Sequence, residues 1–177
     1  KGFSCLNIES DNLGNIWVNT TYGVFCFDNK YNLVYFNFGQ GNGGNIAFNK
    51  KDEVIYTAFY DNTYLFKNKF KWDFYKPLSN ANKNTPKNIL KIAKSENTIW
   101  FGSYLNGLFR YTNGTFNSLN AQGLFKEKNI RDLIIDKNGN LVVGTNLGNV
   151  YVLKPSKSSV KIIAKYRSNK EIIGNTV

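Results

Sequence analysis

Short apolar runs, rich in aromatic and β-branched residues, alternate with turns rich in Gly, Asn and Asp along nearly the whole chain. Runs of this length and composition, bounded by such turn residues, are typical of β-strands. No segment keeps the 3.6-residue period of a long amphipathic helix. The pattern therefore predicts an all-β chain, with strands in four groups of four at residues 5–9, 16–20, 24–27 and 33–36; 45–48, 54–58, 64–67 and 72–75; 89–93, 98–103, 108–111 and 115–119; and 130–136, 141–145, 150–153 and 160–163.

A sequence motif recurs once in each group. Residues 11–18 read Asp-Asn-Leu-Gly-Asn-Ile-Trp-Val, residues 136–143 read Asp-Lys-Asn-Gly-Asn-Leu-Val-Val, and shorter copies occupy 97–102 and 52–58. Aligning the copies superposes Trp17, Tyr56, Trp100 and Val142, at spacings of 39, 44 and 42 residues. Four short antiparallel strands in a period of about 40–45 residues are typical of a β-propeller blade.

The predicted architecture is a β-propeller of four blades, each of four antiparallel strands. The blades are expected at about 1–43, 44–87, 88–128 and 129–164, and residues 165–177 as the opening strand of a further blade or a tail. Because the first repeat begins almost at Lys1, Met is absent and residues 165–177 remain after the fourth blade, we expect the chain to be a fragment of a larger propeller. The alternative is that the four blades close on themselves in a tight ring. Blade faces without a neighbour favour self-association, or further blades in the full-length protein.

Composition narrows the possible chemistry. The 177 residues contain no His, which excludes His-dependent catalytic triads and removes the commonest metal ligand. Two cysteines, Cys5 and Cys26, are too few for a thiolate zinc site, so neither a metal nor a cofactor is predicted. The formal net charge is +11, but the lysines are scattered and only three residues are Arg, so no nucleic-acid site is expected. No apolar run is long enough for a membrane-spanning helix.

Read across its copies, the motif Asp-x-x-Gly-Asn-[Ile/Leu]-Trp-Val-Gly-Thr resembles the two-component regulator propeller repeat. The pattern is incomplete: Asn19 replaces Gly in the first copy, Ala58-Phe59 replaces Gly-Thr in the second, and the third lacks the Asp and the turn glycine. The resemblance implies the periplasmic sensor propeller of a hybrid two-component histidine kinase, many of which sense glycans. The chain itself has no His to phosphorylate and no phosphate-binding Gly-rich loop.

The motif residues are expected to be structural. Gly14 and Gly139 permit the turn, while the carboxylates of Asp11 and Asp136 are placed to accept backbone N–H bonds within it. Indole rings at Trp17 and Trp100 are expected between adjacent blades.

Candidate ligand-binding residues lie on the turns between the second and third strands of the blades. They are Tyr22, Tyr60, Asp61, Tyr104 and Asn106. Tyr rings stack on sugar faces, and Asn and Asp bind hydroxyl groups. The alternative is that the tyrosines pack along the blade edges.

Three functions follow from these observations. The first is a sensor module that recognises a glycan or oligosaccharide and does not catalyse. The second is a protein-interaction scaffold without a small ligand. The third is a propeller glycosidase or lyase; a glycosidase requires two facing carboxylates, for which only Asp61 and Asp132 are placed near the expected channel.

Overall fold

A computed structural model describes residues 4–38, 44–48, 53–58, 63–66, 86–95, 98–113, 115–120, 122–124, 126–157 and 159–167. The described residues form strands and turns without a helix. In chain order the strands are β1 (Cys5–Ser10), β2 (Ile16–Thr20), β3 (Gly23–Phe27), β4 (Leu33–Phe38), β5 (Gly44–Phe48), β6 (Val54–Ala58), β7 (Thr63–Phe66), β8 (Ile89–Ser95), β9 (Thr98–Ser103), β10 (Leu108–Thr112), β11 (Thr115–Ser118), β12 (Ile130–Ile135), β13 (Leu141–Thr145), β14 (Val150–Pro155) and β15 (Val160–Tyr166).

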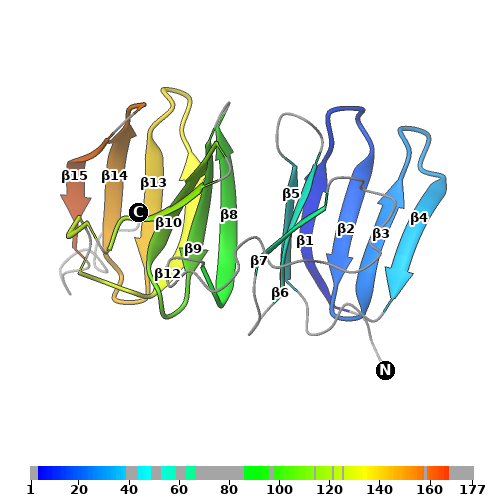
Figure 1. The fold of residues 1–177 in the computed structure, drawn as a ribbon, viewed down its shortest axis with the longest axis horizontal. Helices are drawn as coiled ribbons and strands as arrows, with labels where there is room; N and C mark the ends of the chain where they lie inside the picture. Colours follow the sequence, from blue (N-terminus) through cyan, green and yellow to red (C-terminus); the bar gives the residue numbers. More distant parts are fainter. Residues whose placement is uncertain are drawn as a thin grey trace, which may run out of the picture.

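These strands make four separate antiparallel sheets in which sequence neighbours pair (Figure 1). The orders are β1-β2-β3-β4, β5-β6-β7, β8-β9-β10-β11 and β12-β13-β14-β15, numbered below as blades 1 to 4. The predicted all-β class and its grouping of strands are confirmed for the described residues. The fourth strand predicted for blade 2, at residues 72–75, lies outside them, and β15 continues to Tyr166, three residues past its predicted end.

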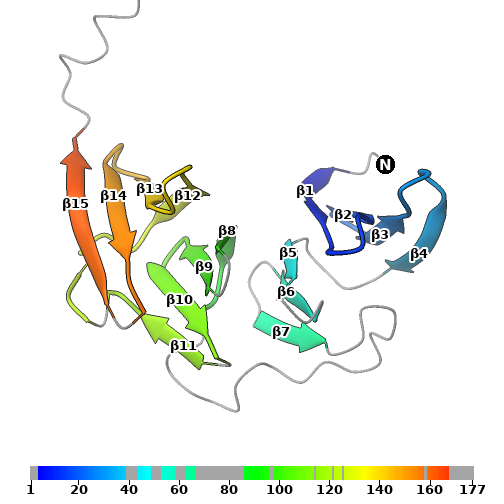
Figure 2. The same cartoon turned by 90° about the horizontal axis from the view of Figure 1, so that it is seen from above.

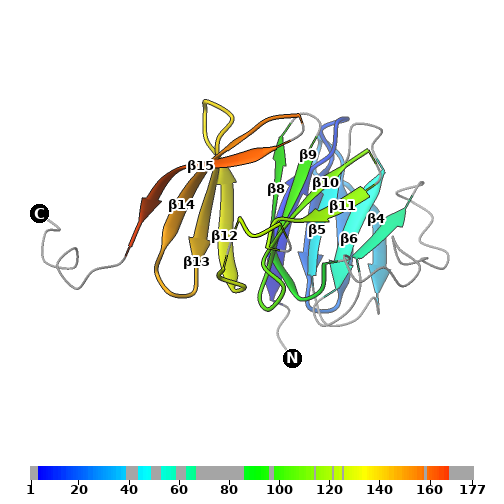
Figure 3. The ribbon, with the colours of Figure 1, turned by 60° about the vertical axis from the view of Figure 1, so that its left-hand side comes forward.

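Viewed from above, the blades stand side by side along an arc, with β1, β5, β8 and β12 on its inner side (Figure 2). Consecutive blades meet mainly through these inner strands: β1 contacts β5, β5 contacts β8, and β8 contacts β12. The side view shows β12, the inner strand of blade 4, next to β8, the inner strand of blade 3 (Figure 3). Meander sheets arranged radially around an axis are the architecture of a β-propeller.

Apolar side chains fill the spaces between neighbouring blades. Trp17 is fully buried and its ring centroid lies 5.4 Å from that of Phe48 on blade 2. Trp100 is also fully buried, in a cluster with Leu133 and Val143 of blade 4. Because a single sheet exposes both of its faces, each blade depends on its neighbours to bury its apolar surface.

The predicted alignment of the second repeat is wrong by one residue. Ile55, fully buried in a cluster with Phe101 of blade 3, holds the position that Trp17 and Trp100 hold in their blades. Tyr56 is the next residue along β6, where it is paired with Ile46. The sequence alignment had matched the aromatic Tyr56 to the tryptophans. In the structure the equivalent residues are those that face the next blade, and a shift of one residue along a strand moves a side chain to the opposite face.

The position two residues after the tryptophan is adjusted separately at each joint between blades. At blades 1 and 2, Asn19 is fully buried and its Nδ2 donates to the carbonyl oxygen of Gly44. At the joint of blades 3 and 4, the small residue is on the earlier blade and the large residue is on the later one. A Cβ on Gly102 would come within 2.7 Å of the Cγ2 atom of Ile130. The departure of Asn19 from the motif is therefore matched by a glycine on the neighbouring blade.

Candidate functional site

One end of the blades forms a rim made of turns and the first residues of the inner strands. In three blades, the residue after the second strand donates its N–H to the carbonyl just before the inner strand. The N···O distances are 3.0 Å for Thr21 to Ser4, 2.9 Å for Tyr104 to Asn88 and 3.0 Å for Asn146 to Asn129. The turns of these three blades that were expected to bind ligand therefore lie at the same end of the blades.

Side chains on blades 3 and 4 meet at this rim. The guanidinium carbon of Arg131 lies 5.1 Å from the ring centroid of Tyr104, a cation–π geometry. Arg131 also donates from Nε to Oδ1 of Asn146 over 2.8 Å. The arrangement leaves Tyr104 about two-fifths exposed, at 38%. An aromatic ring, a guanidinium and an amide therefore face solvent together, and we call Tyr104, Arg131 and Asn146 the rim cluster.

The predicted residues are only partly brought together. Asn106 shares the turn of Tyr104, where its N–H donates to Oγ of Ser103 over 3.0 Å. Tyr22 is 44% exposed on the corresponding turn of blade 1, two blades away in chain order. Tyr60 and Asp61 lie outside the described residues.

Arg131 was not among the predicted residues. It occupies an irregularity in the pairing of β12 with β13, between Ile130 and Asp132. The sequence signal was the arginine itself, one of only three in the chain, at the start of an apolar strand. Its partners were not predictable because they depend on which turns adjoin across the blades.

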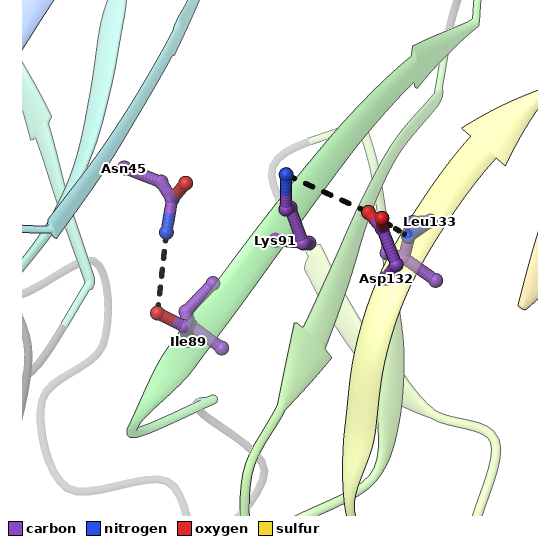
Figure 4. Close-up of polar contacts among 5 residues, drawn as sticks. All are labelled: Asn45, Ile89, Lys91, Asp132 and Leu133. Carbon is purple, nitrogen blue, oxygen red and sulfur yellow. Dashed lines mark hydrogen bonds and ion pairs between the residues drawn. The ribbon is translucent and has the colours of Figure 1, made fainter. Parts of the chain in front are cut away.

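A row of polar side chains links successive inner strands. The Oδ1 atom of Asn7 accepts the N–H of Ile46 on blade 2 over 3.1 Å. One blade further, Asn45 donates to the carbonyl of Ile89 over 3.2 Å, and Lys91 lies 3.6 Å from Asp132 of blade 4 (Figure 4). The equivalent positions in the four inner strands are held by Asn7, Asn45, Lys91 and Asp132. Neighbouring blades are therefore linked at the same position by hydrogen bonds at two joints and by an ion pair at the third.

The described acids are held by cations, amides and hydroxyls. Asp132 pairs with Lys91, and its side chain is 69% exposed. Burial raises the pKa of the Glu9 carboxyl, with Lys94 acting in the opposite direction. Burial also raises the pKa of Glu127, but hydrogen bonds from Thr145, Tyr151 and Asn149 outweigh it and leave that pKa below its ordinary value. Glu127 is therefore an ionised structural group that ties the segment before β12 to blade 4.

The turn acids act within their own turns. The Oδ1 atom of Asp11 accepts the N–H groups of Leu13 and Asn15, and its Oδ2 accepts Nε1 of Trp17 over 3.1 Å. Asp136 makes the same backbone contacts with Asn138 and Asn140. The glycines of these turns have positive φ, +80° at Gly14 and +78° at Gly139.

The turn expected at residues 28–32, between the third and fourth strands of blade 1, is of the same kind, although this likeness was not predicted. Asp28 accepts the N–H groups of Lys30 and Asn32, each over 2.8 Å. The positive-φ position is held by Tyr31, at +63°, where the motif has glycine, so the sequence does not match the motif.

Within the described ranges, no cluster of three or more His, Cys, Asp or Glu residues is arranged to hold a metal ion. The same part of the chain contains no helix with the length and apolar character needed to cross a bilayer.

Searches with the sequence found no matching family model and no matching curated protein. Comparison of structures found several similar chains. The extracellular domain of a protein named as a hybrid two-component system, BT4673 from B. thetaiotaomicron, matches with a TM-score of 0.65 and 20% identity over 90% of this chain. The WD40 domain of Neurospora crassa Pan2 matches with a TM-score of 0.64 and 13% identity over 92% of this chain. A protein named as a gluconolactonase matches with a TM-score of 0.60 and 12% identity over 90% of this chain.

The fold is that of a β-propeller. The chain spans 21% of the BT4673 chain and 49% of the Pan2 chain, so it corresponds to part of each. Its structural neighbours thus include an extracellular domain named for a hybrid two-component system, together with proteins of other kinds.

Proposed function

We propose that this chain is a non-catalytic, ligand-sensing part of the propeller of a bacterial two-component regulator, and that it recognises a glycan or oligosaccharide. The rim cluster is the observation that carries the proposal. It combines an exposed aromatic ring with amide and guanidinium hydrogen-bonding groups, the chemistry needed to stack on a sugar ring and bind its hydroxyls. The structural likeness to the extracellular domain named for a hybrid two-component system supports a periplasmic location, with membrane anchor and histidine kinase elsewhere in the full-length protein.

Glycan-array screening followed by calorimetric titration tests the proposal. Tyr104→Ala removes the stacking surface and is expected to weaken binding of the identified glycan about tenfold or more, the order expected when a hot-spot aromatic is truncated. Tyr31→Ala is the matched control, because Tyr31 is 77% exposed on the β3–β4 turn, at the opposite end of the blades. Equal loss of affinity in both variants would contradict binding at the rim.

Two alternatives remain distinguishable by experiment. The enzyme alternative is disfavoured by the contacts of the described acids, of which Asp132 is paired with a lysine and Glu127 is held ionised by hydrogen bonds. Glycan turnover abolished by Asp61→Asn would restore it. Absence of binding to any glycan, with capture of a specific protein partner, would favour the scaffold alternative.

We also propose that two copies of this chain associate through the open faces of blades 1 and 4. In the described residues these faces carry exposed apolar side chains, including Ile8 at 61% and Ile134 at 63%. The two faces correspond to the two surfaces that pack against each other between blades 3 and 4. On blade 1, Ile8 holds the position of Leu133, which packs on blade 3. On blade 4, Val142 holds the position of Trp100, which packs on blade 4 from blade 3. A second copy continues the stacking already present between the blades, and two four-blade arcs close a ring around a two-fold axis.

A disulfide trap tests this association. Cys5 holds the place of Ile130, and Gly144 holds the place of Gly102, whose built Cβ lies 3.2 Å from the Cβ of Ile130. A Gly144→Cys variant is therefore expected to form covalent dimers on oxidation, because disulfides join Cβ atoms about 3.5–4.5 Å apart. Cys5→Ser should abolish them, while Cys26 is fully buried. A monomer in light scattering without crosslinks would refute the association.

A further inference from the structure

Blade 3 contains a buried arginine at a position where the other blades have apolar residues. Arg110 pairs with Trp100 across the sheet, and the corresponding residues are Cys26, Leu65 and Val152. Arg110 is only 9% exposed. In the other blades this position makes an apolar contact, so a charged residue there conflicts with the pattern of the repeat. Such conflicts are found most often at functional sites.

No carboxylate of the described residues neutralises the positive charge of Arg110. Its Nη2 donates to the carbonyl oxygen of Lys157 on blade 4, and its guanidinium carbon lies 5.9 Å from the ring centroid of Trp100. Its Nε is buried without an acceptor. A guanidinium presents five N–H donors, and a buried cation without a counterion is strongly unfavourable.

The indole N–H of the neighbouring Trp100 also has no hydrogen-bond acceptor within the described part of the chain. In blade 1 the indole Nε1 of Trp17 donates to Oδ2 of Asp11, the acid of the repeat motif. Blade 3 has no acid at that place in the motif, and Nε1 of Trp100 is buried without an acceptor. Two adjacent buried N–H donors thus lack the kind of carboxylate that satisfies the tryptophan of blade 1.

Two adjoining clefts open at Arg110, at the end of the blades opposite the rim. The smaller has a volume of about 130 Å³ and the larger about 700 Å³. Arg110, Thr112 and Lys157 line both, Asn117 and Ser159 the smaller, and Ser95 and Thr98 the larger. Among the described residues lining these clefts there are two cations, several hydroxyl and amide groups, and no acid.

We propose that the cleft between blades 3 and 4 is a binding site for a ligand bearing a carboxylate or sulfate group. The oxyanion accepts from the guanidinium of Arg110, which lines both clefts, and Lys157 adds a second positive charge. Charge-assisted hydrogen bonds of this kind are about twice as strong as neutral ones. The volume of the larger cleft is within the range of small-molecule sites, so the body of the ligand extends toward Ser95 and Thr98. This site is separate from the rim and does not depend on its function.

Chemical unfolding with increasing sodium acetate, sodium glucuronate or sodium sulfate, at ionic strength held constant with sodium chloride, tests the proposal. In the wild-type protein, each anion that binds should move the unfolding transition to higher denaturant concentration until the site is saturated. An anion at ten times its Kd lowers the unfolding equilibrium constant about elevenfold. Equal affinities for acetate and glucuronate identify the carboxylate alone as the recognised group, and tighter binding of glucuronate identifies a sugar acid.

Three variants separate the site from general salt effects. Arg110→Val, which copies Val152 of blade 4, is expected to fold and to lose the saturable shift. Lys157→Gln removes the second positive charge that lines both clefts and should weaken binding severalfold. Arg167→Gln removes an exposed positive charge outside the cleft and should change nothing.

Two results would overturn the proposal. One is the absence of a saturable shift in the wild-type protein. The other is an equal shift in Arg110→Val, which would mean that the anion stabilises the protein without binding at Arg110, as sulfate does when it is excluded from protein surfaces. Glu96, which follows β8 in the sequence, lies outside the described residues, so Glu96→Gln is included. That variant should show the same saturable shift as the wild type, and a shift seen only in Glu96→Gln would contradict the proposal, because the Glu96 carboxylate would then be the partner of Arg110.

Discussion

Gly102 and Gly144 hold the same position in blades 3 and 4, yet we expect opposite effects when each is replaced by alanine. Neither has a positive φ, so backbone strain does not enter. At Gly102 the added Cβ would lie 2.7 Å from Cγ2 of Ile130 and 3.3 Å from Cδ1 of Leu133. At Gly144 the nearest atoms, both of Asp132, are 3.9 Å away.

The expected magnitudes follow from this geometry. Ile130 is fully buried between the blades and cannot move aside without disturbing its neighbours. Overpacking by one methyl group costs about 1–3 kcal/mol, while replacing Gly by Ala at a compatible backbone gains about 0.4–1 kcal/mol through the unfolded state. Gly102→Ala should therefore lower the free energy of unfolding by about 1–2 kcal/mol. Gly144→Ala should leave it unchanged or raise it by up to about 1 kcal/mol.

Urea unfolding at a protein concentration where light scattering shows a monomer measures both changes, provided that the m-values agree. A double-mutant cycle with Ile130→Ala checks the cause. In that background the 2.7 Å contact with Cγ2 is removed, while Cβ of residue 130 at 3.2 Å and Cδ1 of Leu133 at 3.3 Å remain, so Gly102→Ala should destabilise much less. Equal destabilisation by the two alanine variants would refute the view that Gly102 makes room for Ile130.

Three further predictions concern single residues. Trp100→Ala should destabilise the protein by about 3–5 kcal/mol, because the ring is fully buried, and thermal melts should show a much smaller effect for Tyr104→Ala. Tyr31→Gly should stabilise by about 1 kcal/mol, since Tyr31 adopts φ +63° and is largely exposed, whereas Gly139→Ala should destabilise by a similar amount; urea titration checks the pair. Hydrogen bonds from Asn140 hold the pKa of the Asp136 carboxyl below its ordinary value, so its contribution to stability is complete above the unfolded pKa of about 3.9 and is lost as pH falls through the folded pKa. Stability measured from pH 6 to pH 2 should therefore fall less steeply in Asp136→Asn, and identical profiles would contradict this role.

Local pattern determined the fold class and most strand positions. Alternation and turn residues act over a few neighbouring positions, which is why β2, β6, β9 and β13 have the predicted bounds. The spacing of the repeats was also sufficient for the propeller architecture, because four equivalent sheets that cannot bury their faces alone must stack. Identifying the Asp11 and Asp136 turns required only the motif. The turn at residues 28–32 was also expected, but its likeness to those two was concealed because Tyr31 occupies the position where the motif has glycine.

Contacts between blades were decided by tertiary structure alone. The sequence carries Asn19 as a departure from a glycine, but only the packing shows that Gly44 on the next blade accommodates it. The same holds for Arg131, whose partners Tyr104 and Asn146 come from turns 27 and 15 residues away along the chain. Arg110 is apparent in the sequence as a basic residue among apolar ones, but its burial without a carboxylate depends on where blade 4 lies against it. Sequence periodicity specifies which face of a strand is buried, whereas the identity of the residue opposite depends on how two blades approach each other.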